Sequence, residues 1–374
     1  MGQANRKIIA RLANNVDMLA QYRMSILNSL EFDFLDVNKD DIRSAILNNS
    51  PIDTLLHVIM VISNPCEYAR RCILAREFQK RMEFEENVKL YIVELAYGEQ
   101  HFIITDSHNP RHLQLKGTTP LWHKENLINL GIKKLLPKGW KAVAWIDADV
   151  EFDSASWALD TLKVLNGHKD VIQLFSHVVD MNKQKNAMSI FPSFGYQLCQ
   201  GRPYFEHHVA LQESNGINMW HPGYAWACTR RAYEKMGGLF ELGILGSGDL
   251  IMAYSHMGQG VKSLPSDVSE GYKEAVVQFQ TKVKTLRLGY VPGIIRHHFH
   301  GSKKNRKYVE RWQIVVENKY DPATHITKNN DGLTIPTPAC PKKLLDQIFL
   351  YFAERNEDEG YKNNHPQVEC SNSL

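Results

Sequence analysis

The sequence lacks any long apolar run. No stretch of its 374 residues approaches the roughly 20 apolar residues that a membrane-spanning helix requires. The basic N-terminus is followed by an apolar segment too short and too interrupted for a secretory signal, and residues 1–6 lack the Ser or Thr of an N-myristoylation site. We therefore expect a reduced, cytoplasmic protein without a membrane anchor, and a bacterial or viral origin fits this setting best.

An excess of one charge and a cysteine framework are also missing. The sequence has 44 Lys and Arg against 41 Asp and Glu, a formal net charge of +3, so no global field favours a nucleic-acid or membrane partner. The six cysteines are scattered without a Cys-x-x-Cys pair, which argues against a structural zinc site. Hydrophobic residues make up 43%, which is ordinary for a globular protein. Any anion site must therefore come from a local cluster.

The apolar segments that are present predict alternating strands and helices. Apolar runs at 55–62, 88–94 and 141–146 are typical of buried strands, and the segments 66–82 and 123–136 between them predict helices. This alternation predicts an α/β fold with a doubly wound sheet. Such sheets bind ligands beyond the carboxyl ends of their strands.

The chain divides into three predicted regions. Residues 1–50 have apolar residues at helical spacing and predict a helical N-terminal extension. Residues 51–335 form the main domain. Residues 336–374 contain a short apolar helix over Leu344–Phe352, and a polar tail that we expect to be disordered from Glu354 on.

Two carboxylates, Asp147 and Asp149, directly follow the apolar run at 141–146. Inside the sheet they would be costly, whereas at the carboxyl end of a strand they reach the ligand-binding edge. Mg²⁺ and Mn²⁺ prefer oxygen ligands and commonly take one or two carboxylates together with substrate phosphates. An Asp-capped turn is the structural alternative, but the position at a strand end favours a metal site.

The segment Val143–Phe152 resembles the Asp-x-Asp segment of GT-A-fold glycosyltransferases, especially inverting family 2 and its galactosyltransferase-like relatives. The resemblance, which spans residues 55–320, implies a GT-A-like fold with a Rossmann-like nucleotide-binding sheet and a mixed sheet on the acceptor side. It also implies that Asp147 contacts the ribose or sugar of the donor. Asp149 would bind Mn²⁺ or Mg²⁺ on the donor diphosphate.

Further segments match the nucleotide-binding half of that family in the same order. They are the turn after the first strand, the end of the second strand, and the helix that precedes the Asp-x-Asp segment. An ordinary turn, strand end or helix explains each of them equally well. The donor-binding residues that the resemblance implies here are Ser63, Asn64, Glu94, Lys124 and Asn129.

Two later segments resemble the acceptor half. His221–Ala227 is similar to the stretch of small residues and Trp that lines the sugar pocket, and Gly246–Asp249 to the Gly-rich segment that ends in the catalytic carboxylate. Asp249 is the implied base for the acceptor hydroxyl. A core Trp and an N-cap Asp are the structural alternatives, and the family often has Glu where this chain has Gly248. The implied pocket residues are Trp220, Gly223, Trp226 and Gly248.

A histidine-rich segment, residues 297–301, ends a strand-like stretch. On a strand, His298 and His300 would point to the same side. The resemblance implies that a His completes the metal site, His300 first and His298 second. The basic run that follows is either a solvated helix face or a lid over the diphosphate. The implied phosphate-binding residues in that run are Lys303, Arg306 and Arg311.

The resemblance as a whole implies metal-dependent transfer of a sugar, with inversion, from a UDP-sugar to an acceptor hydroxyl. UDP-galactose, UDP-glucose and UDP-N-acetylhexosamines stay open as donors, and glycans, lipid-linked sugars, proteins and modified DNA as acceptors. Transfer to modified DNA bases is one alternative, with basic contacts from residues 303–311. A catalytically inactive nucleotide-sugar- or carbohydrate-binding protein is another, favoured by Gly248. A nucleotidyltransferase fits less well, because the first predicted strand is not followed by a Gly-rich basic loop.

Overall fold

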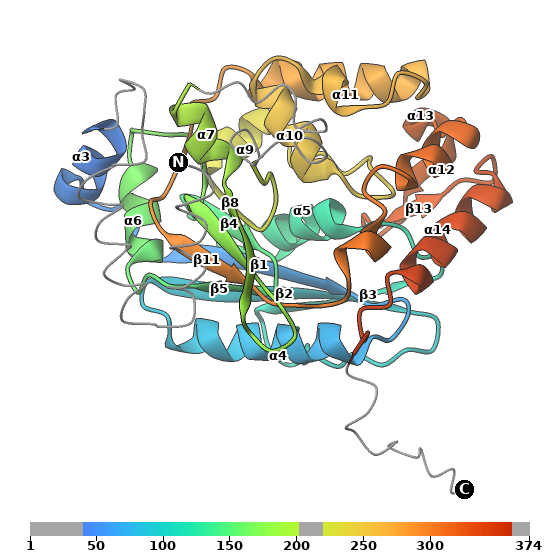
Figure 1. The fold of residues 1–374 in the computed structure, drawn as a ribbon, viewed down its shortest axis with the longest axis horizontal. Coiled ribbons are helices and arrows are strands. Elements are labelled where there is room, and N and C mark those ends of the chain that lie inside the picture. The colour runs from blue at the N-terminus through green and yellow to red at the C-terminus, as the bar shows by residue number, and fades with distance from the viewer. Residues whose placement is uncertain (1–39, 202–219, 361–374) are drawn as a thin grey trace, which may run out of the picture.

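Figure 1 shows a computed structural model, which describes residues 40–201 and 220–360. Its helices are α3 (Asp40–Asn48), α4 (Ala69–Phe84), α5 (Lys124–Leu135), α6 (Trp157–Val164), α7 (Phe194–Cys199), α9 (Arg230–Met236), α10 (Gly248–His256), α11 (Glu270–Val283), α12 (Arg311–Glu317), α13 (Pro322–His325) and α14 (Lys342–Glu354), with 3₁₀ turns η1 (Gly260–Ser263) and η2 (Lys303–Arg306). Its strands are β1 (Leu56–Ser63), β2 (Val88–Tyr97), β3 (His112–Gly117), β4 (Ala142–Ile146), β5 (Val150–Phe152), β6 (Val171–Gln173), β7 (His177–Met181), β8 (Ala187–Pro192), β9 (Ala225–Thr229), β10 (Leu288–Tyr290), β11 (Ile294–His297), β12 (Ile326–Lys328) and β13 (Thr334–Pro336).

A seven-stranded sheet forms the centre, in the order β10-β6-β9-β4-β1-β2-β3. The half made of β4, β1, β2 and β3 is parallel, whereas β9 runs antiparallel to both of its neighbours. The predicted α/β fold, with a parallel half and a mixed half, is confirmed. Because β1 and β4 are parallel, their carboxyl ends lie at the same edge, and Ser63 and Asp147 meet there.

Helices cover both faces of this sheet. Helix α4 lies along one face, and α5, α10 and α11 lie on the other (Figure 1). Alternate side chains of β1 point to opposite faces of the sheet. Val58 and Met60 pack in the core beneath α4, and Ile59 packs in the core beneath α5. Each is fully buried, and burial of such a side chain contributes roughly 1.5–3 kcal/mol. The two cores hold the sheet edge in place from both sides.

A smaller sheet, in the order β5-β11-β7-β8, packs beside the first. Strand β5 begins at Val150, directly after the two carboxylates, and pairs antiparallel with β11. In that register His297 is opposite Val150. The pairing therefore brings the end of β11 to the segment that carries Asp149.

The polar segment after Glu354 is not a loose tail as far as the structure describes it. Its carboxylate Asp358 accepts hydrogen bonds from the backbone N–H groups of Ala69 and Arg70 at the start of α4, at 3.0 and 2.8 Å. Glu359 accepts from the backbone N–H of Ser302 at 3.2 Å. We call residues 355–359 the C-terminal strap, because they connect α4 to the segment that follows β11.

Several predictions are changed or fall outside the described residues. The strand β3 was not predicted, since its edge position leaves half of its residues partly exposed and its sequence weakly patterned. The strand before the two carboxylates is therefore the fourth along the chain. Of the predicted N-terminal extension, α3 is described and residues 1–39 are not; residues 361–374 are also outside the description. Within the described ranges, none of the helices has the length and apolar character needed to cross a bilayer.

Candidate active site

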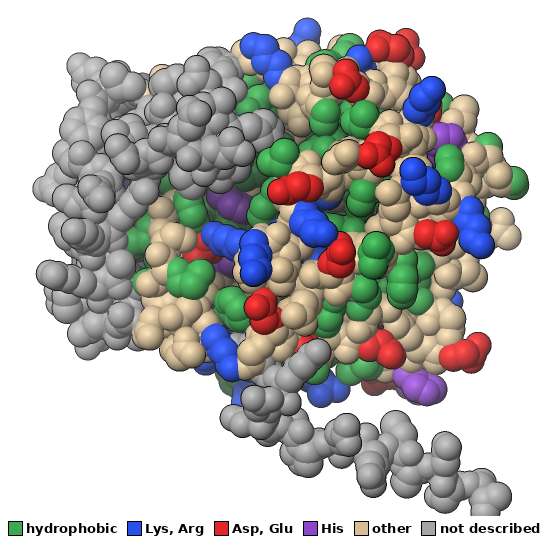
Figure 2. All heavy atoms as spheres, turned by 45° about the vertical axis from the view of Figure 1, so that its right-hand side comes forward, with side chains coloured by type: hydrophobic (Ala, Val, Ile, Leu, Met, Phe, Trp, Pro, Cys, Tyr) green, Lys and Arg blue, Asp and Glu red, His purple; other side chains and the backbone are tan. Residues whose placement is uncertain are grey.

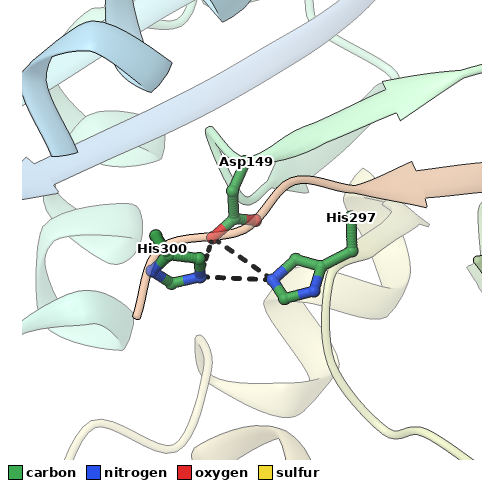
Figure 3. Close-up of side chains that lie close together, drawn as sticks. All are labelled: Asp149, His297 and His300. Atoms are coloured by element: carbon green, nitrogen blue, oxygen red, sulfur yellow. Dashed lines mark hydrogen bonds and ion pairs between the residues drawn. The ribbon is translucent and has the colours of Figure 1, made fainter. Parts of the chain in front are cut away.

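Asp149, His297 and His300 converge at the carboxyl edge of the sheet (Figure 3). His300 Nε2 lies 2.8 Å from Asp149 Oδ2, His297 Nε2 lies 3.7 Å from the same oxygen, and the two Nε2 atoms are 3.2 Å apart. One ligand atom from each residue falls within 4.8 Å of the others, so a single cation could contact all three. The aspartate follows β4, and the histidines come from the end of β11 and the loop after it.

The structure assigns the second histidine differently from the sequence. His298 Nε2 lies 2.9 Å from Glu151 Oε2, apart from this cluster. The strand β11 ends at His297, so the alternation that would place His298 and His300 on one side does not extend to His300. His297, which was not predicted, lies beside Asp149 and His300, and His298 does not.

The chemistry of the cluster fits a divalent cation. Asp149 Oδ1 is buried and has no hydrogen-bond partner in the described part of the chain, which is costly unless a ligand takes it up. Burial alone would raise the pKa of Asp149, but His300 and His297 outweigh it and hold that pKa well below its usual range. The carboxylate is therefore ionised, as a metal ligand must be.

A second set of groups orients the two histidines. His297 Nδ1 lies 2.8 Å from Asp180 Oδ1, and Lys303 contacts the other oxygen of that buried carboxylate. Burial lowers the pKa of His297, but Asp149 and Asp180 outweigh it and raise it to about 9. His300 Nδ1 lies 3.7 Å from Glu357 Oε2 in the C-terminal strap. Carboxylates behind metal-binding histidines fix the ring orientation in this way.

The cluster opens into a cleft with basic and aromatic walls. On the face shown in Figure 2, Lys and Arg side chains gather around His side chains. Trp122 and Phe352 both line this cleft, and their rings stack with centroids 6.4 Å apart and 13° between their planes. The charged side chains that line the cleft are Arg71, Lys124, Asp147, Asp149, His300, Arg306, Arg355 and Glu357.

The C-terminal strap forms one wall of the cleft. Glu357 is fully buried and binds Arg71 at 2.5 Å and Arg355 Nε at 2.7 Å. Burial would raise the pKa of Glu357, but the two guanidinium groups hold it well below its usual range. No sequence signal marked this segment, because Arg71, which binds Glu357, lies 286 positions away along the chain.

Lys124, the first residue of α5, connects the cleft to a second cavity. Its Nζ lies 2.5 Å from Asp147 Oδ1. Burial would lower the pKa of Lys124, but Asp147, Asp249 and Glu125 keep it raised, so the side chain is a cation. The predicted cleft residues Ser63, Lys124, Asp147 and Arg306 are thus brought together.

The second cavity, of about 20 Å³, is lined by most of the residues predicted for the acceptor side. Asp249 lies in the first turn of α10, where its Oδ1 accepts from the backbone N–H of Leu250 at 2.8 Å. The indole N–H of Trp226 donates to Pro222 O at 2.7 Å. The predicted residues that line this cavity are Gly223, Trp226, Gly248 and Asp249, and Glu125 joins them without having been predicted.

The remaining predicted residues have structural contacts outside the two cavities. Asn64 caps the turn before α4 through Tyr68, and Asn129 bonds the backbone of Leu239. Trp220 packs between Phe194 and Tyr254 in the core. Glu94 accepts hydrogen bonds from the backbone of residues 103–105, and Arg311 donates to Ser247 Oγ at 2.7 Å. Lys303 acts through Asp180. The residues that do not line either cavity are Asn64, Glu94, Asn129, Trp220, His298, Lys303 and Arg311.

Comparison with known proteins gives only distant likenesses. No protein-family model and no curated protein matches the sequence. A mannosyltransferase from Pyrobaculum calidifontis, solved in complex with GDP-Man and Mn²⁺, is 12% identical over 81% of this chain and 72% of its own, with a TM-score of 0.34. A protein from Desulfovibrio desulfuricans G20, titled as a nucleotide-diphospho-sugar transferase, is 9% identical over 64% of this chain and 80% of its own, with a TM-score of 0.28. Overlaps this weak do not establish a shared activity.

Proposed function

We propose that this protein is a metal-dependent glycosyltransferase that uses a nucleotide sugar as donor. The observation that carries the proposal is the cluster of Asp149, His297 and His300, with a buried unpaired carboxylate oxygen, at the mouth of a cleft lined by basic side chains. A cation at this corner and guanidinium groups around it match the charge of a nucleoside diphosphate. The GT-A-like resemblance of the sequence points to the same chemistry.

The cluster would hold the metal through one carboxylate and two imidazoles. Carboxylate oxygen suits both Mg²⁺ and Mn²⁺, so we propose Mn²⁺ or Mg²⁺ as the cofactor. A bound divalent cation would neutralise charge on the donor diphosphate. Asp180 and Glu357 would keep the two rings in their binding orientation.

The donor would lie along the cleft with its diphosphate next to Asp149, His297 and His300. We call this cluster, together with Asp180 and Glu357 behind it, the metal corner. Arg71, Arg306 and Lys124 line that end, and charge-assisted hydrogen bonds from such groups to phosphate are strong. The stacked rings of Trp122 and Phe352 offer an apolar wall for the nucleoside. A UDP-sugar is the donor that we propose, and Asp147 would contact its ribose or sugar, held in place by Lys124.

Transfer would take place between the cleft and the second cavity. The acceptor hydroxyl oxygen forms the new bond to the anomeric carbon, and the bond from that carbon to the diphosphate oxygen breaks, with its electron pair going to the diphosphate. The hydroxyl proton goes to the carboxylate of Asp249. Attack opposite the leaving group inverts the anomeric configuration.

The test is hydrolysis of a panel of UDP- and GDP-sugars, with and without Mn²⁺, by the wild type and Asp149→Ala. We expect slow release of a nucleoside diphosphate that needs the metal and falls by about 10³-fold in the variant, the scale on which a lost electrostatic contact to the leaving group acts. The matched control is Glu151→Gln, which changes the next carboxylate but lies outside the cluster. It should keep most of the activity.

Calorimetric titration with UDP and Mn²⁺ separates the remaining outcomes. Binding without hydrolysis of any donor would favour the inactive binding protein that Gly248 suggested. A wild type that binds neither UDP nor GDP in the presence of Mn²⁺ would overturn the proposed function.

A further inference from the structure

Glu125, the second residue of α5, occupies the space beside Gly248. The side chain is buried, with 7% of its surface exposed. A Cβ atom on residue 248 would lie 2.5 Å from Glu125 Oε1, and its three nearest neighbours would all be Glu125 atoms. The absence of a side chain at position 248 therefore makes room for a carboxylate that comes from another helix.

Glu125 and Asp249 border the same small cavity. Asp249 Oδ2 approaches the opposite wall, where it would lie 2.6 Å from a Cβ on Gly223. The volume of about 20 Å³ between these walls is enough for one water-sized group. A hydroxyl group has this size, and the acceptor of the proposed reaction is a hydroxyl. Two glycines thus let two carboxylates face a space that fits the reacting group.

The charges around Glu125 suit it to proton transfer. The titratable groups that face it are Lys124, Asp249, Asp147 and Tyr272. Lys124 is already in contact with Asp147 at 2.5 Å. Burial, reinforced by Asp249 and Asp147 against the effect of Lys124, raises the pKa of Glu125 to about 7. A general base works best when its pKa lies near the working pH.

We propose that Glu125 is a second catalytic carboxylate, which forms a pair with Asp249 and receives the proton of the acceptor hydroxyl. This inference rests on the proposed function and deepens it. The hydroxyl donates a hydrogen bond to the pair, its oxygen bonds to the anomeric carbon as the bond to the diphosphate breaks, and the proton that Asp249 takes up comes to rest on Glu125. The site therefore uses two carboxylates, one from α10 and one from α5.

The first experiment compares the wild type with Glu125→Gln. Water takes the acceptor's place, and the probe is the nucleotide sugar that the wild type hydrolyses fastest with Mn²⁺. We expect donor binding, measured by calorimetry, to change less than about twofold, because Glu125 does not line the donor cleft. The hydrolysis rate should fall by about 10²-fold, the lower end of general-base contributions. The wild-type rate should also rise with pH around 7, and this rise should be lost in the variant.

The matched control is Glu241→Gln, which changes a carboxylate bonded to Asn126 and Asn129 on the same helix but outside the small cavity. Its pH profile should match that of the wild type. If Glu125→Gln keeps both the rate and the pH profile of the wild type, the role of Glu125 is refuted while the proposed function stands. If the wild type binds donor but hydrolyses none, both catalytic carboxylates are refuted.

The second experiment moves the carboxylate to the neighbouring helix. Gly248→Glu alone should clash with Glu125 and unfold at a lower temperature than the wild type. Combined with Glu125→Ala, the same change places a carboxylate in the vacated space from α10. We expect the double variant to be at least about tenfold more active than Glu125→Ala, a fraction of the general-base contribution. A correctly folded double variant with no recovery would indicate that Glu125 is only structural.

Discussion

The buried carboxylates of the metal corner and those of the second cavity have opposite electrostatic surroundings. At the metal corner each buried carboxylate faces cations: Asp180 contacts His297 and Lys303, and Glu357 contacts Arg71 and Arg355. In the second cavity Glu125 and Asp249 border one small space, and the nearby Lys124 is bound to Asp147. The first arrangement keeps its carboxylates ionised, whereas the second favours a carboxyl group that holds a proton.

This difference indicates a division of labour along the site. A corner of balanced charges holds its geometry and can take up a cation and an anionic diphosphate without large rearrangement. In the second cavity, burial and the neighbouring carboxylate of Asp249 raise the affinity of Glu125 for a proton, which suits a step that removes a proton from a hydroxyl. The same substitution, Glu to Gln, should therefore have opposite effects on stability in the two regions.

The largest change in the free energy of unfolding is expected for Glu357→Gln at the metal corner. The change leaves Arg355, 4% exposed, and the partly buried Arg71 without their shared counter-ion, and breaking a buried ion pair costs about 3 kcal/mol or more. Chemical denaturation should show this loss in the free energy of unfolding. Glu354→Gln is the control, because that carboxylate pairs with Lys307 at the surface with 41% of each side chain exposed. The control should lose less than about 1 kcal/mol. Equal losses in the two variants would contradict the buried role of Glu357.

A smaller effect of opposite sign is expected for Glu125→Gln. Its folded-state pKa of about 7 lies above the ordinary 4.5, so the native state binds the extra proton between these values and the unfolded state does not. The contribution that protonated Glu125 makes to the stability of the wild type should therefore be full below about pH 4.5 and decline as the pH rises to about 7. This decline should amount to about 3 kcal/mol. The variant should lack this decline and be more stable than the wild type at alkaline pH.

Unfolding curves of the two proteins at acidic and alkaline pH provide the measurement. A Glu125→Gln protein that is less stable than the wild type at alkaline pH would show that Glu125 is stabilised by its surroundings as an anion, contrary to the comparison between the two regions.

The smallest expected effect is a change in Mn²⁺ affinity, which should differ between variants of two adjacent histidines. His297→Ala removes a cluster residue and should weaken Mn²⁺ binding, measured by electron paramagnetic resonance of free Mn²⁺, by about 10- to 100-fold. His298→Ala removes a neighbour that contacts Glu151 instead and should leave the affinity within a few-fold of the wild type. The reverse order would restore the assignment that the sequence alone suggested.

Much of the parallel half of the fold could be predicted from the sequence. The runs that become β1, β2 and β4 are mainly apolar because both faces of these strands are covered, and that pattern is local. Asp149 could be placed at the site because it follows such a run directly. Asp249 and Trp226 were predicted through a resemblance over short segments; both line the second cavity, and their roles stay predictions.

The residues that the sequence did not single out owe their place to contacts between distant segments. His297 rather than His298 joins Asp149 because β11 pairs with β5 in one register, and a shift of one residue would reverse the choice. Glu125 reaches Gly248, and Glu357 reaches Arg71, across more than 100 positions. Local periodicity determined where the strands end, and therefore which carboxylate lies at the ligand-binding edge of the sheet. Only tertiary packing decided which other charged side chains lie beside that carboxylate, because the electrostatic field at a buried group depends on neighbours in space and not on neighbours in sequence.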